Sequence, residues 1–480
     1  MNRIYNRMNR KMPNRLIFLM IVVPVFADSS KPPNFVFLFN DDQDLTLGGM
    51  TPMSRTLALM QDGIYLKNFF ANSPLCCPSR AALVSGRYPH NYVSSDGSGC
   101  MKLNVSTPEF YNHTFPVYFK DHGYTVGAFG KLLNPTGTPA CYHQPMPGVD
   151  DYLLMCNSDR YFNVSLVNAN GHYISGFQPQ DYLTAIVGNA TVKFIEKALQ
   201  NDKPFFAYIG PHAPHYPATP APCAKDHHFL LRQQLPLDKY EEELITELFR
   251  DRWRSLLSVD DLMMDVVSML TNHSAMDNTY FIWSSDHGYK LGQFCLPREK
   301  HQPYENDIRV PFFIKGPDIH KHKSLSEVVS MIDVAPTLLE LAGIEVHPEM
   351  EGESFASLLT GKEENSWKKD KHIIEFWSQG DGIKINHYVD GPNNTFIGVR
   401  LLNESHNIAY LEFYENIVGE HEFNIEPCDY ELFDLTSDPY QLNNLYNTPN
   451  MDRELVKELK QYLHQVVLCK GSQCHQHILT

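Results

Sequence analysis

Two apolar segments of this sequence are each followed immediately by acidic side chains. The segment NFVFLFN is followed by Asp41 and Asp42, and TYFIWSS is followed by Asp286 and His287. Adjacent carboxylates repel each other unless a cation or a proton lies between them, and hard divalent cations prefer oxygen ligands. Each pair alone is common in turns and caps. Together, at the ends of two apolar segments, they predict a divalent metal site.

A pair of adjacent cysteines opens a second unusual stretch, LCCPSRAALVSGR (75–87). Pro78 suits the first turn of a helix and Gly86 can end it, so Cys76 is expected at the N-terminal end, where amides and dipole favour an anion. Arg80 lies one turn further along and can reach the same anion. The alternative is a disulfide cysteine beside a buried one. A vicinal pair does not easily serve two distant partners, and this alternative does not explain the arginines.

The elements that carry these residues alternate as in a layered α/β domain. Strands are expected at 34–40, 124–130, 204–210 and 279–286, and amphipathic helices within 181–200 and 250–272. Ligands of open α/β sheets bind outside the carboxyl ends of the strands, which is where the acidic pairs lie. After residues 352–362, shorter strand-like segments and a helix over 451–467 predict a smaller α+β domain from about residue 370.

Composition and the start of the chain limit the class of protein. The 480 residues carry a formal charge of −16, which argues against a nucleic-acid binder. The apolar run LIFLMIVVPVFA is too short for a membrane span, which needs about 20 residues. It follows several basic residues and ends at a small-residue cleavage pattern, so residues 1–27 are expected to be a signal peptide.

N-glycosylation sequons agree with entry into the secretory pathway. They are found at Asn104, Asn112, Asn163, Asn189, Asn272, Asn393 and Asn403. A protein of the lysosome or of the extracellular space is expected, and the signal does not distinguish the two. Cys469 and Cys474 are close enough in sequence to close a short disulfide loop.

The stretch from Cys76 to Arg80, followed by AALVSGR, resembles the Cys-x-Pro-Ser-Arg signature of type I sulfatases, with Ser85 where threonine is usual. In that family a formylglycine-generating enzyme of the endoplasmic reticulum converts the first cysteine to formylglycine. The resemblance therefore makes Cys76 the precursor of an aldehyde. An odd number of cysteines then remains, and Cys77 is expected to be the free, buried thiol.

Further segments extend the resemblance across nearly all of the chain after the signal peptide. They include NDDQDLTLGGMTP, FGKLLN, NTYFIWSSDHGYKLGQF and YENDIRVPFFIKGP. They are similar to the branch of sulfatases that removes the 6-sulfate of N-acetylglucosamine from heparan and keratan sulfate. Extracellular endosulfatases share many of these segments, but they carry a long basic insertion that this chain lacks. The resemblance thus favours an exo-acting enzyme on a sulfated glycan.

The resemblance also implies a fold and a domain division. It predicts an alkaline-phosphatase-like sulfatase fold, in which helices flank a large mixed sheet. The catalytic domain is expected over residues 31–369. Residues 370–480 are expected to form a C-terminal subdomain with an antiparallel sheet and a terminal helix.

Metal and catalytic residues are carried over from the same family. One Ca²⁺ ion is expected on Asp41, Asp42, Asp286, His287 and the modified Cys76. Histidine is an unusual ligand for a hard cation, although some sulfatases use Asp-His where others use Asp-Asn.

The remaining groups act on the sulfate ester itself. Arg80 would hold the formylglycine hydrate, and Lys131 and Lys300 would bind the sulfate oxygens. His215 would protonate the leaving sugar oxygen, with His212 as a further contact. Fixed cations lower the barrier because negative charge gathers on the oxygens around sulfur during cleavage. One hydroxyl of the hydrate attacks sulfur, and loss of the proton of the other expels sulfate.

One catalytic role and three alternative interpretations remain open. Many sulfatases have a histidine two residues after the lysine that matches Lys131, but this chain has Leu133, so the base that opens the covalent intermediate is unassigned. Phosphodiesterases and phosphonate hydrolases of the same superfamily share the metal arrangement, but most use Ser or Thr as nucleophile. A non-catalytic glycan-binding homologue would be expected to have lost a metal aspartate or the cysteine. The substrate could also be another sulfated glycan or a small sulfate ester.

Overall fold

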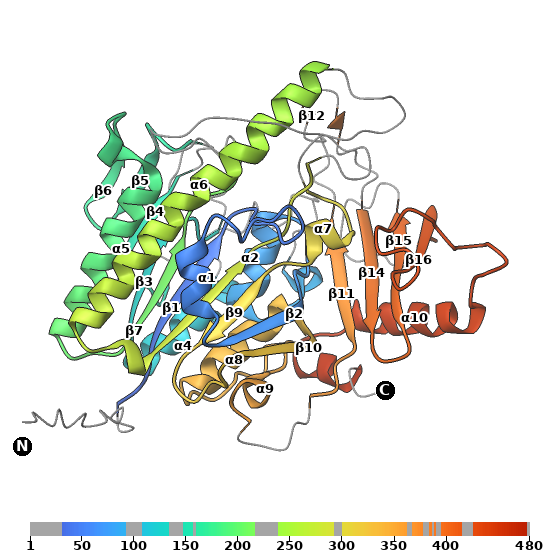
Figure 1. Ribbon diagram of the computed structural model, residues 1–480. Coiled ribbons are helices and arrows are strands. Elements are labelled where there is room, and N and C mark those ends of the chain that lie inside the picture. The colour runs from blue at the N-terminus through green and yellow to red at the C-terminus, as the bar shows by residue number, and fades with distance from the viewer. Residues whose placement is uncertain are drawn as a thin grey trace, which may run out of the picture.

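Figure 1 shows a computed structural model of the chain. The structure describes residues 31–92, 108–133, 147–156, 160–216, 239–291, 300–361, 367–377, 384–385, 388–389, 395–414 and 426–477. The signal peptide expected for residues 1–27 lies outside the described residues. None of the helices in the described ranges has the length and apolar character needed to cross a membrane.

A ten-stranded mixed sheet forms the centre of the molecule, in the order β10-β2-β9-β8-β1-β7-β3-β4-β5-β6. Its strands are β1 (Asn34–Asn40), β2 (Ile64–Phe70), β3 (Thr125–Gly130), β4 (Asp151–Met155), β5 (Ser165–Asn168), β6 (Gly171–Ile174), β7 (Phe205–Gly210), β8 (Thr279–Ser285), β9 (Phe312–Lys315) and β10 (Lys323–Ser330). The four strands β8, β1, β7 and β3 at its centre run parallel, and β9 is antiparallel to both of its neighbours. The expected strands and the mixed sheet are confirmed.

Helices cover both faces of this sheet (Figure 1). They are α1 (Ser54–Met60), α2 (Cys76–Ser85), α3 (Pro108–Tyr111), α4 (Phe115–Asp121), α5 (Leu183–Gln200), α6 (Lys239–Asn272), α7 (Glu305–Ile308), α8 (Val334–Leu341) and α9 (Ala356–Thr360). Successive side chains of a strand point to opposite faces. Val36 and Leu38 of β1 accordingly join the apolar cluster that contains residues of α5 and α6. Phe35, Phe37 and Phe39 join the cluster on the α2, α4 and α8 side.

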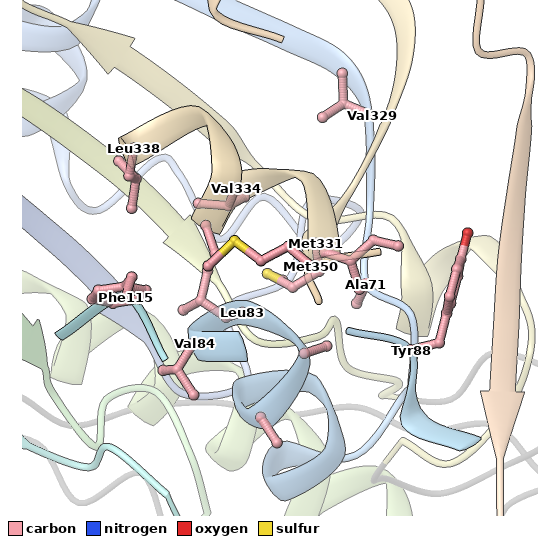
Figure 2. Close-up of a cluster of buried hydrophobic side chains, with 14 of the residues drawn as sticks. Ala71, Leu83, Val84, Tyr88, Phe115, Val329, Met331, Val334, Leu338 and Met350 are labelled. Carbon is pink, nitrogen blue, oxygen red and sulfur yellow. The ribbon is translucent and has the colours of Figure 1, made fainter. Parts of the chain in front are cut away.

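Helix α2 is held in this second cluster along its whole length, since all of its residues are buried. Figure 2 shows Leu83 beside Met331 of the segment that leads into α8, with Val334 and Leu338 of α8 beyond it, and Val84 on the side nearer Phe115. Burying one such aliphatic side chain contributes about 1.5–3 kcal/mol. The helix ends at Gly86, whose φ of 64° is in the left-handed region that glycine adopts without strain. These contacts fix the position of the helix start, and therefore of Cys76.

The C-terminal part forms a four-stranded antiparallel sheet in the order β11-β14-β15-β16, with helix α10 packed against it. Its elements are β11 (Lys371–Phe376), β14 (Thr395–Leu402), β15 (Asn407–Tyr414), β16 (Asp429–Asp434) and α10 (Arg453–Val466), and β12 (Lys384–Ile385) pairs separately with β13 (Tyr388–Val389). The expected strands and terminal helix are confirmed. Ile373 and Val456 lie in the same apolar cluster as Phe35 of the large sheet. The division at residue 370 stays a prediction.

The expectation of a free thiol at Cys77 is wrong. Cys77 is disulfide-bonded, and so is Cys156. Successive residues of a helix point about 100° apart, so Cys76 can face the site while Cys77 packs in the apolar cluster and pairs with a cysteine from elsewhere. The other thiol in the described ranges is Cys428, which is exposed and donates to the Phe413 carbonyl over 3.3 Å. The expected disulfide between Cys469 and Cys474 is confirmed.

Polar contacts join the segment around α7 to the C-terminal sheet. Arg400 Nε donates to Glu305 Oε1 over 2.7 Å, and the Tyr304 hydroxyl donates to Glu431 Oε2 over 3.2 Å. Burial raises the pKa of Glu431 to about 7, with a smaller contribution from Asp429, although the Tyr304 hydrogen bond opposes the shift. An unfolded glutamate titrates near pH 4.3. The free energy of unfolding should therefore fall as the pH rises from about 4.3 to about 7, because the folded chain holds a proton on Glu431 that the unfolded chain releases.

We expect Glu431→Gln to raise the midpoint of thermal unfolding by about 1–2 °C at about pH 7.5, and by less at about pH 5, because glutamine removes the cost of ionising this carboxyl. Differential scanning calorimetry at the two pH values checks this. Glu404→Gln, on an exposed turn of the same sheet, is the matched control and should leave the midpoint nearly unchanged, as surface substitutions usually do. An equal shift of the Glu431→Gln midpoint at both pH values would contradict the interpretation.

Candidate active site

The three acidic residues singled out in the sequence meet at the carboxyl ends of two neighbouring strands. Asn40 of β1 is paired with Ser285 of β8, so the residues that follow them lie side by side. The Asp42 amide donates to Asp286 Oδ1 over 3.0 Å. The side chains of Asp41, Asp42 and Asp286 are 0% exposed. Three carboxylates are thus buried together and require compensating charge.

His287 faces the same point as these carboxylates. Its Nδ1 donates to the Gly288 carbonyl over 2.9 Å, which leaves Nε2 directed inward. Nε2 lies 3.3 Å from Cys76 Sγ, 3.5 Å from Asp42 Oδ1 and 3.6 Å from Asp286 Oδ2.

Two overlapping groups of ligand atoms result from this convergence. Within each group all atoms lie within 4.8 Å of one another, and the groups are Asp41, Asp42, Cys76 and His215, and Cys76, Asp286 and His287. Three of the six residues in these groups are aspartates, whose oxygens are the ligands that a hard divalent cation prefers. The residues fit the expected metal site, and His215 lies closer to it than the sequence indicated.

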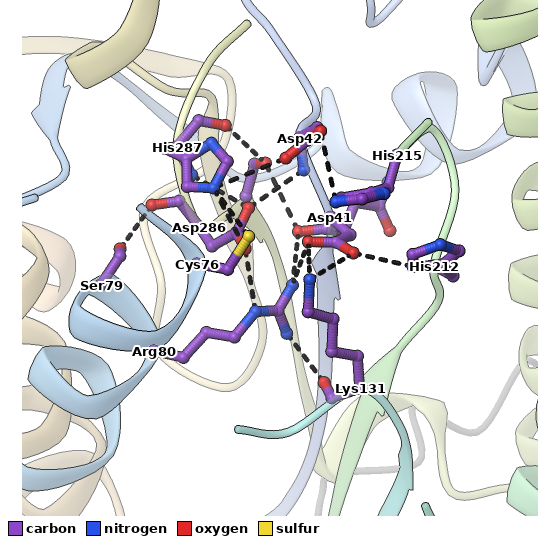
Figure 3. A network of polar contacts seen from close by, with 12 residues as sticks. Asp41, Asp42, Cys76, Ser79, Arg80, Lys131, His212, His215, Asp286 and His287 are labelled. Carbon is purple, nitrogen blue, oxygen red and sulfur yellow. Dashed lines mark hydrogen bonds and ion pairs between the residues drawn. The ribbon is translucent and has the colours of Figure 1, made fainter. Parts of the chain in front are cut away.

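Arg80 lies within this cluster rather than at its edge (Figure 3). Its guanidinium donates to Asp286 Oδ2 over 2.8 Å, to Asp41 Oδ1 over 3.2 Å and to the Lys131 carbonyl over 2.7 Å. Burial alone would lower the pKa of Arg80, but Asp286, Tyr208 and Asp41 hold it above its ordinary value. The residue therefore stays charged and joins α2 to the ends of β1, β3 and β8.

Two lysines pair with the adjacent aspartates. Lys131 Nζ, at the end of β3, lies 2.8 and 2.7 Å from the two carboxylate oxygens of Asp41. Lys300 Nζ lies 2.9 and 3.1 Å from those of Asp42. Burial alone would raise the pKa of both carboxyls, but Lys131 and His215 hold that of Asp41 well below its usual value, and Lys300 and His215 lower that of Asp42. Both aspartates are thus ionised.

The two histidines of the segment after β7 lie on the other side of the aspartates (Figure 3). Their rings stack with centroids 4.5 Å apart. His212 Nδ1 lies 2.9 Å from Asp41 Oδ2, and His215 Nε2 lies 3.9 Å from Asp42 Oδ2. His215 Nδ1 donates to the Tyr216 carbonyl over 2.6 Å, so Nε2 is the nitrogen that can exchange a proton at the site. Burial lowers the pKa of His215 well below its ordinary value, although Asp42 and Asp41 oppose the shift.

Burial also raises the pKa of Cys76 to about 12, although Lys131 and Lys300 oppose the shift. The unmodified side chain is therefore a thiol. Leu133, which stands where many sulfatases have histidine, packs into the apolar cluster on the α2, α4 and α8 side of the sheet.

Several residues at the site were not identified from the sequence. Tyr208 accepts a hydrogen bond from Arg80 Nη1 over 3.0 Å, and the Ser79 hydroxyl donates to the Asp286 carbonyl. Arg252 of α6 reaches the Asp42 carbonyl over 2.7 Å. Ser79 lies inside the signature and Tyr208 lies two residues before the end of β7, so their positions could have indicated the first two. Arg252 lies in the middle of an amphipathic helix and had no such signal.

Comparison with known proteins agrees with this geometry. The family model described as "Sulfatase" matches residues 33–344, and "N-sulphoglucosamine sulphohydrolase, C-terminal" matches residues 298–391. The chain belongs to the sulfatase family, and it is a sulfuric ester hydrolase. N-acetylglucosamine-6-sulfatase of Capra hircus is 33% identical over 93% of this chain and 86% of its own length.

Solved structures share the fold at lower identity. A protein in complex with its substrate D-glucosamine-2-N,6-O-disulfate superposes with a TM-score of 0.68 at 19% identity, covering 91% of this chain and 97% of that chain. The phosphonate monoester hydrolase of Silicibacter pomeroyi superposes with a TM-score of 0.67 at 18% identity, covering 92% and 96%. The expected alkaline-phosphatase-like sulfatase fold is confirmed.

We expect Lys300→Ala to lower the rate of sulfate ester hydrolysis by about two orders of magnitude or more, because it removes a buried cation that pairs with Asp42 in this cluster. Initial rates with a saturating sulfate ester measure the loss, and a thermal melt verifies the fold. Lys315→Ala, which breaks only a surface ion pair with Asp62, is the matched control. An unchanged rate in folded Lys300→Ala would remove this lysine from the site.

Proposed function

We propose that the protein removes the 6-sulfate of N-acetylglucosamine from heparan or keratan sulfate, using a formylglycine made from Cys76 and one Ca²⁺ ion. The observation that carries the proposal is the buried cluster in which Cys76 meets three carboxylates and three cations. Similarity to N-acetylglucosamine-6-sulfatases over 93% of the chain supports the choice of sugar.

The bound sulfate would lie among the cationic side chains. Lys131 and Lys300 each hold one aspartate in the structure, so they can turn to the sulfate oxygens once a metal ion neutralises those aspartates. When bound, the divalent ion supplies further positive charge beside the ester, and the aldehyde hydrate at residue 76 supplies the attacking hydroxyl. Arg80, which is already charged and fixed, would orient residue 76.

The leaving oxygen of a sugar is strongly basic and needs a proton. His215 is the donor that we propose, because its Nε2 faces the cluster while its Nδ1 is committed to the Tyr216 carbonyl. Burial disfavours the imidazolium, but the negative charge of a bound sulfate ester would favour it. His212, which stacks on His215 and bonds to Asp41, would hold the ring of His215 in place.

Modification at Cys76 would have to precede folding. Cys76 is 3% exposed and Arg80 is fully buried, so the formylglycine-generating enzyme could reach the signature only in an unfolded chain. This requirement agrees with a protein made in the endoplasmic reticulum and sent to the lysosome or secreted. The sequon asparagines Asn112, Asn189, Asn272 and Asn403 are exposed and could carry glycans there.

A phosphonate monoester hydrolase with the same fold is the main competing activity. Similarity at 18% identity carries no argument about the substrate. A smaller sulfate ester, or another sulfated glycan, would use the same cluster with different contacts to the alcohol. Assays with sulfate, phosphonate and phosphate monoesters of one alcohol separate these possibilities.

We expect a peptide spanning residues 71–80 of the secreted protein to have the mass of formylglycine at position 76, with sulfate release from N-acetylglucosamine 6-sulfate at about pH 5. Cys76→Ser should keep fold and secretion but abolish turnover, since a plain serine would remain sulfated. Tandem mass spectrometry and sulfate assay measure the two. An unmodified thiol from cells able to make formylglycine, or near-normal activity of Cys76→Ser, would refute the nucleophile; an aldehyde without release would refute the sugar.

We expect chelation to reduce activity by about two orders of magnitude or more, and added Ca²⁺ to restore it, because the buried carboxylates then lose the cation they share. Lys131 and Lys300 can still pair with Asp41 and Asp42, so the protein should stay folded. Circular dichroism verifies the fold, and metal analysis of the purified protein gives the stoichiometry. Full activity of a metal-free sample would contradict the assignment.

A further inference from the structure

Arg252 is a buried cation that the proposed chemistry does not use. It lies on α6 with a side chain that is 2% exposed. Its guanidinium lies 4.1 Å from the centre of the Tyr289 ring, and Lys300 Nζ lies 5.8 Å from that ring. A guanidinium removed from water in this way is costly unless its donors are paired.

The donors of Arg252 are divided between two segments of the site. Nη2 donates to the Asp42 carbonyl over 2.7 Å and to Asp44 Oδ1 over 2.6 Å, in the segment after β1. Nη1 donates to the Pro214 carbonyl over 3.2 Å, in the segment after β7. One planar group therefore joins the segment that carries the metal aspartates to the peptide bond that leads into His215.

The segment after β1 has a backbone conformation that the contacts around it hold in place. Asp42 has a φ of 63°, a left-handed conformation that non-glycine residues adopt only when their surroundings hold them. Asp44, the other partner of Arg252, also accepts from the Leu47 amide over 2.8 Å and so holds the following turn. On the other segment, the Tyr161 hydroxyl donates to the His215 carbonyl over 2.9 Å. Arg252 ties the two together, in addition to the His212 contact with Asp41 and the hydrogen bond from the Asp41 amide to the Ala213 carbonyl.

We propose that Arg252 is a positioning residue that sets the distance between His215 and Asp42, and thereby aligns the proton donor with the leaving oxygen of a sulfate held at the aspartates. The inference rests on the proposed role of His215. Lysine cannot replace it, because a single ammonium cannot span both segments with the fixed fork of a guanidinium. A displacement of about 1 Å at a reacting group can cost about a hundredfold in rate.

The test compares two substrates that differ in their need for a proton. The leaving group of N-acetylglucosamine 6-sulfate is the basic alkoxide of the sugar. The leaving group of 4-nitrophenyl sulfate is a stable phenolate, which needs little protonation. We expect Arg252→Lys and Arg252→Gln to lower kcat on the sugar sulfate by about 10- to 100-fold, and on 4-nitrophenyl sulfate by about 3-fold or less. A purely structural defect would lower both rates alike.

Three further variants complete the design. His215→Ala serves as the reference and should show the same preference for the better leaving group, and the double variant with Arg252→Gln should lose little more. Asp44→Asn weakens one contact of Arg252 without removing the arginine, and it should show a smaller loss of the same kind. It replaces Arg252→Gln in the test if that variant folds poorly. Arg254→Gln is the matched control, because its ion pair with Asp251 lies on the same helix.

Each outcome decides between the claims. If the Arg252 variants and Asp44→Asn lose equally on both substrates, or lose nothing, while His215→Ala discriminates between them, this inference is overturned and the proposed function stands. If His215→Ala does not discriminate, the proton donor is misassigned and both fail. Selective loss in all of these variants, with normal rates in Arg254→Gln, supports the inference.

Discussion

Burial of like charges is the constraint on which this structure depends. Asp41, Asp42 and Asp286 lie together out of water, and an uncompensated buried carboxylate costs several kcal/mol. Arg80, Lys131 and Lys300 supply matching charge in the structure. In the proposed function, the same arrangement would attract a divalent cation to the carboxylates and an anionic sulfate to the cations. One electrostatic requirement therefore underlies both the integrity of the site and its chemistry.

The sheet meets this requirement by bringing together the carboxyl ends of its four central strands. The order β8-β1-β7-β3 aligns four carboxyl ends at one edge of the sheet, where side chains from distant parts of the sequence converge. Helix α2 approaches the same edge from one face and delivers Cys76 and Arg80. Helix α6 lies on the other face and delivers Arg252, so contacts from both layers hold the segments that carry the chemistry.

Strong local patterns made much of this predictable. The strand over Asn34–Asn40 and the helix start at Cys76 follow from an apolar run and from proline chemistry, and the signature around Cys76 identified the family. The expectation for Cys77 failed because pairing of cysteines depends on which elements meet in space. Arg252 was not identified for a similar reason. A basic residue in an amphipathic helix is ordinary until the fold shows that its carbonyl partners belong to two separate segments of the candidate site.

The sequence by itself determined the class of this protein. Residue types at strand ends, the cysteine signature and the alternation of apolar segments are local properties, and each can be seen without knowing which strands are neighbours. Only the tertiary structure decided which charges compensate one another. Lys131 pairs with Asp41, Lys300 with Asp42 and Arg80 with Asp286, over separations of 90, 258 and 206 residues. Such pairings follow from strand order and helix packing, because the distance between two charges is set by the whole fold rather than by the residues that flank either one.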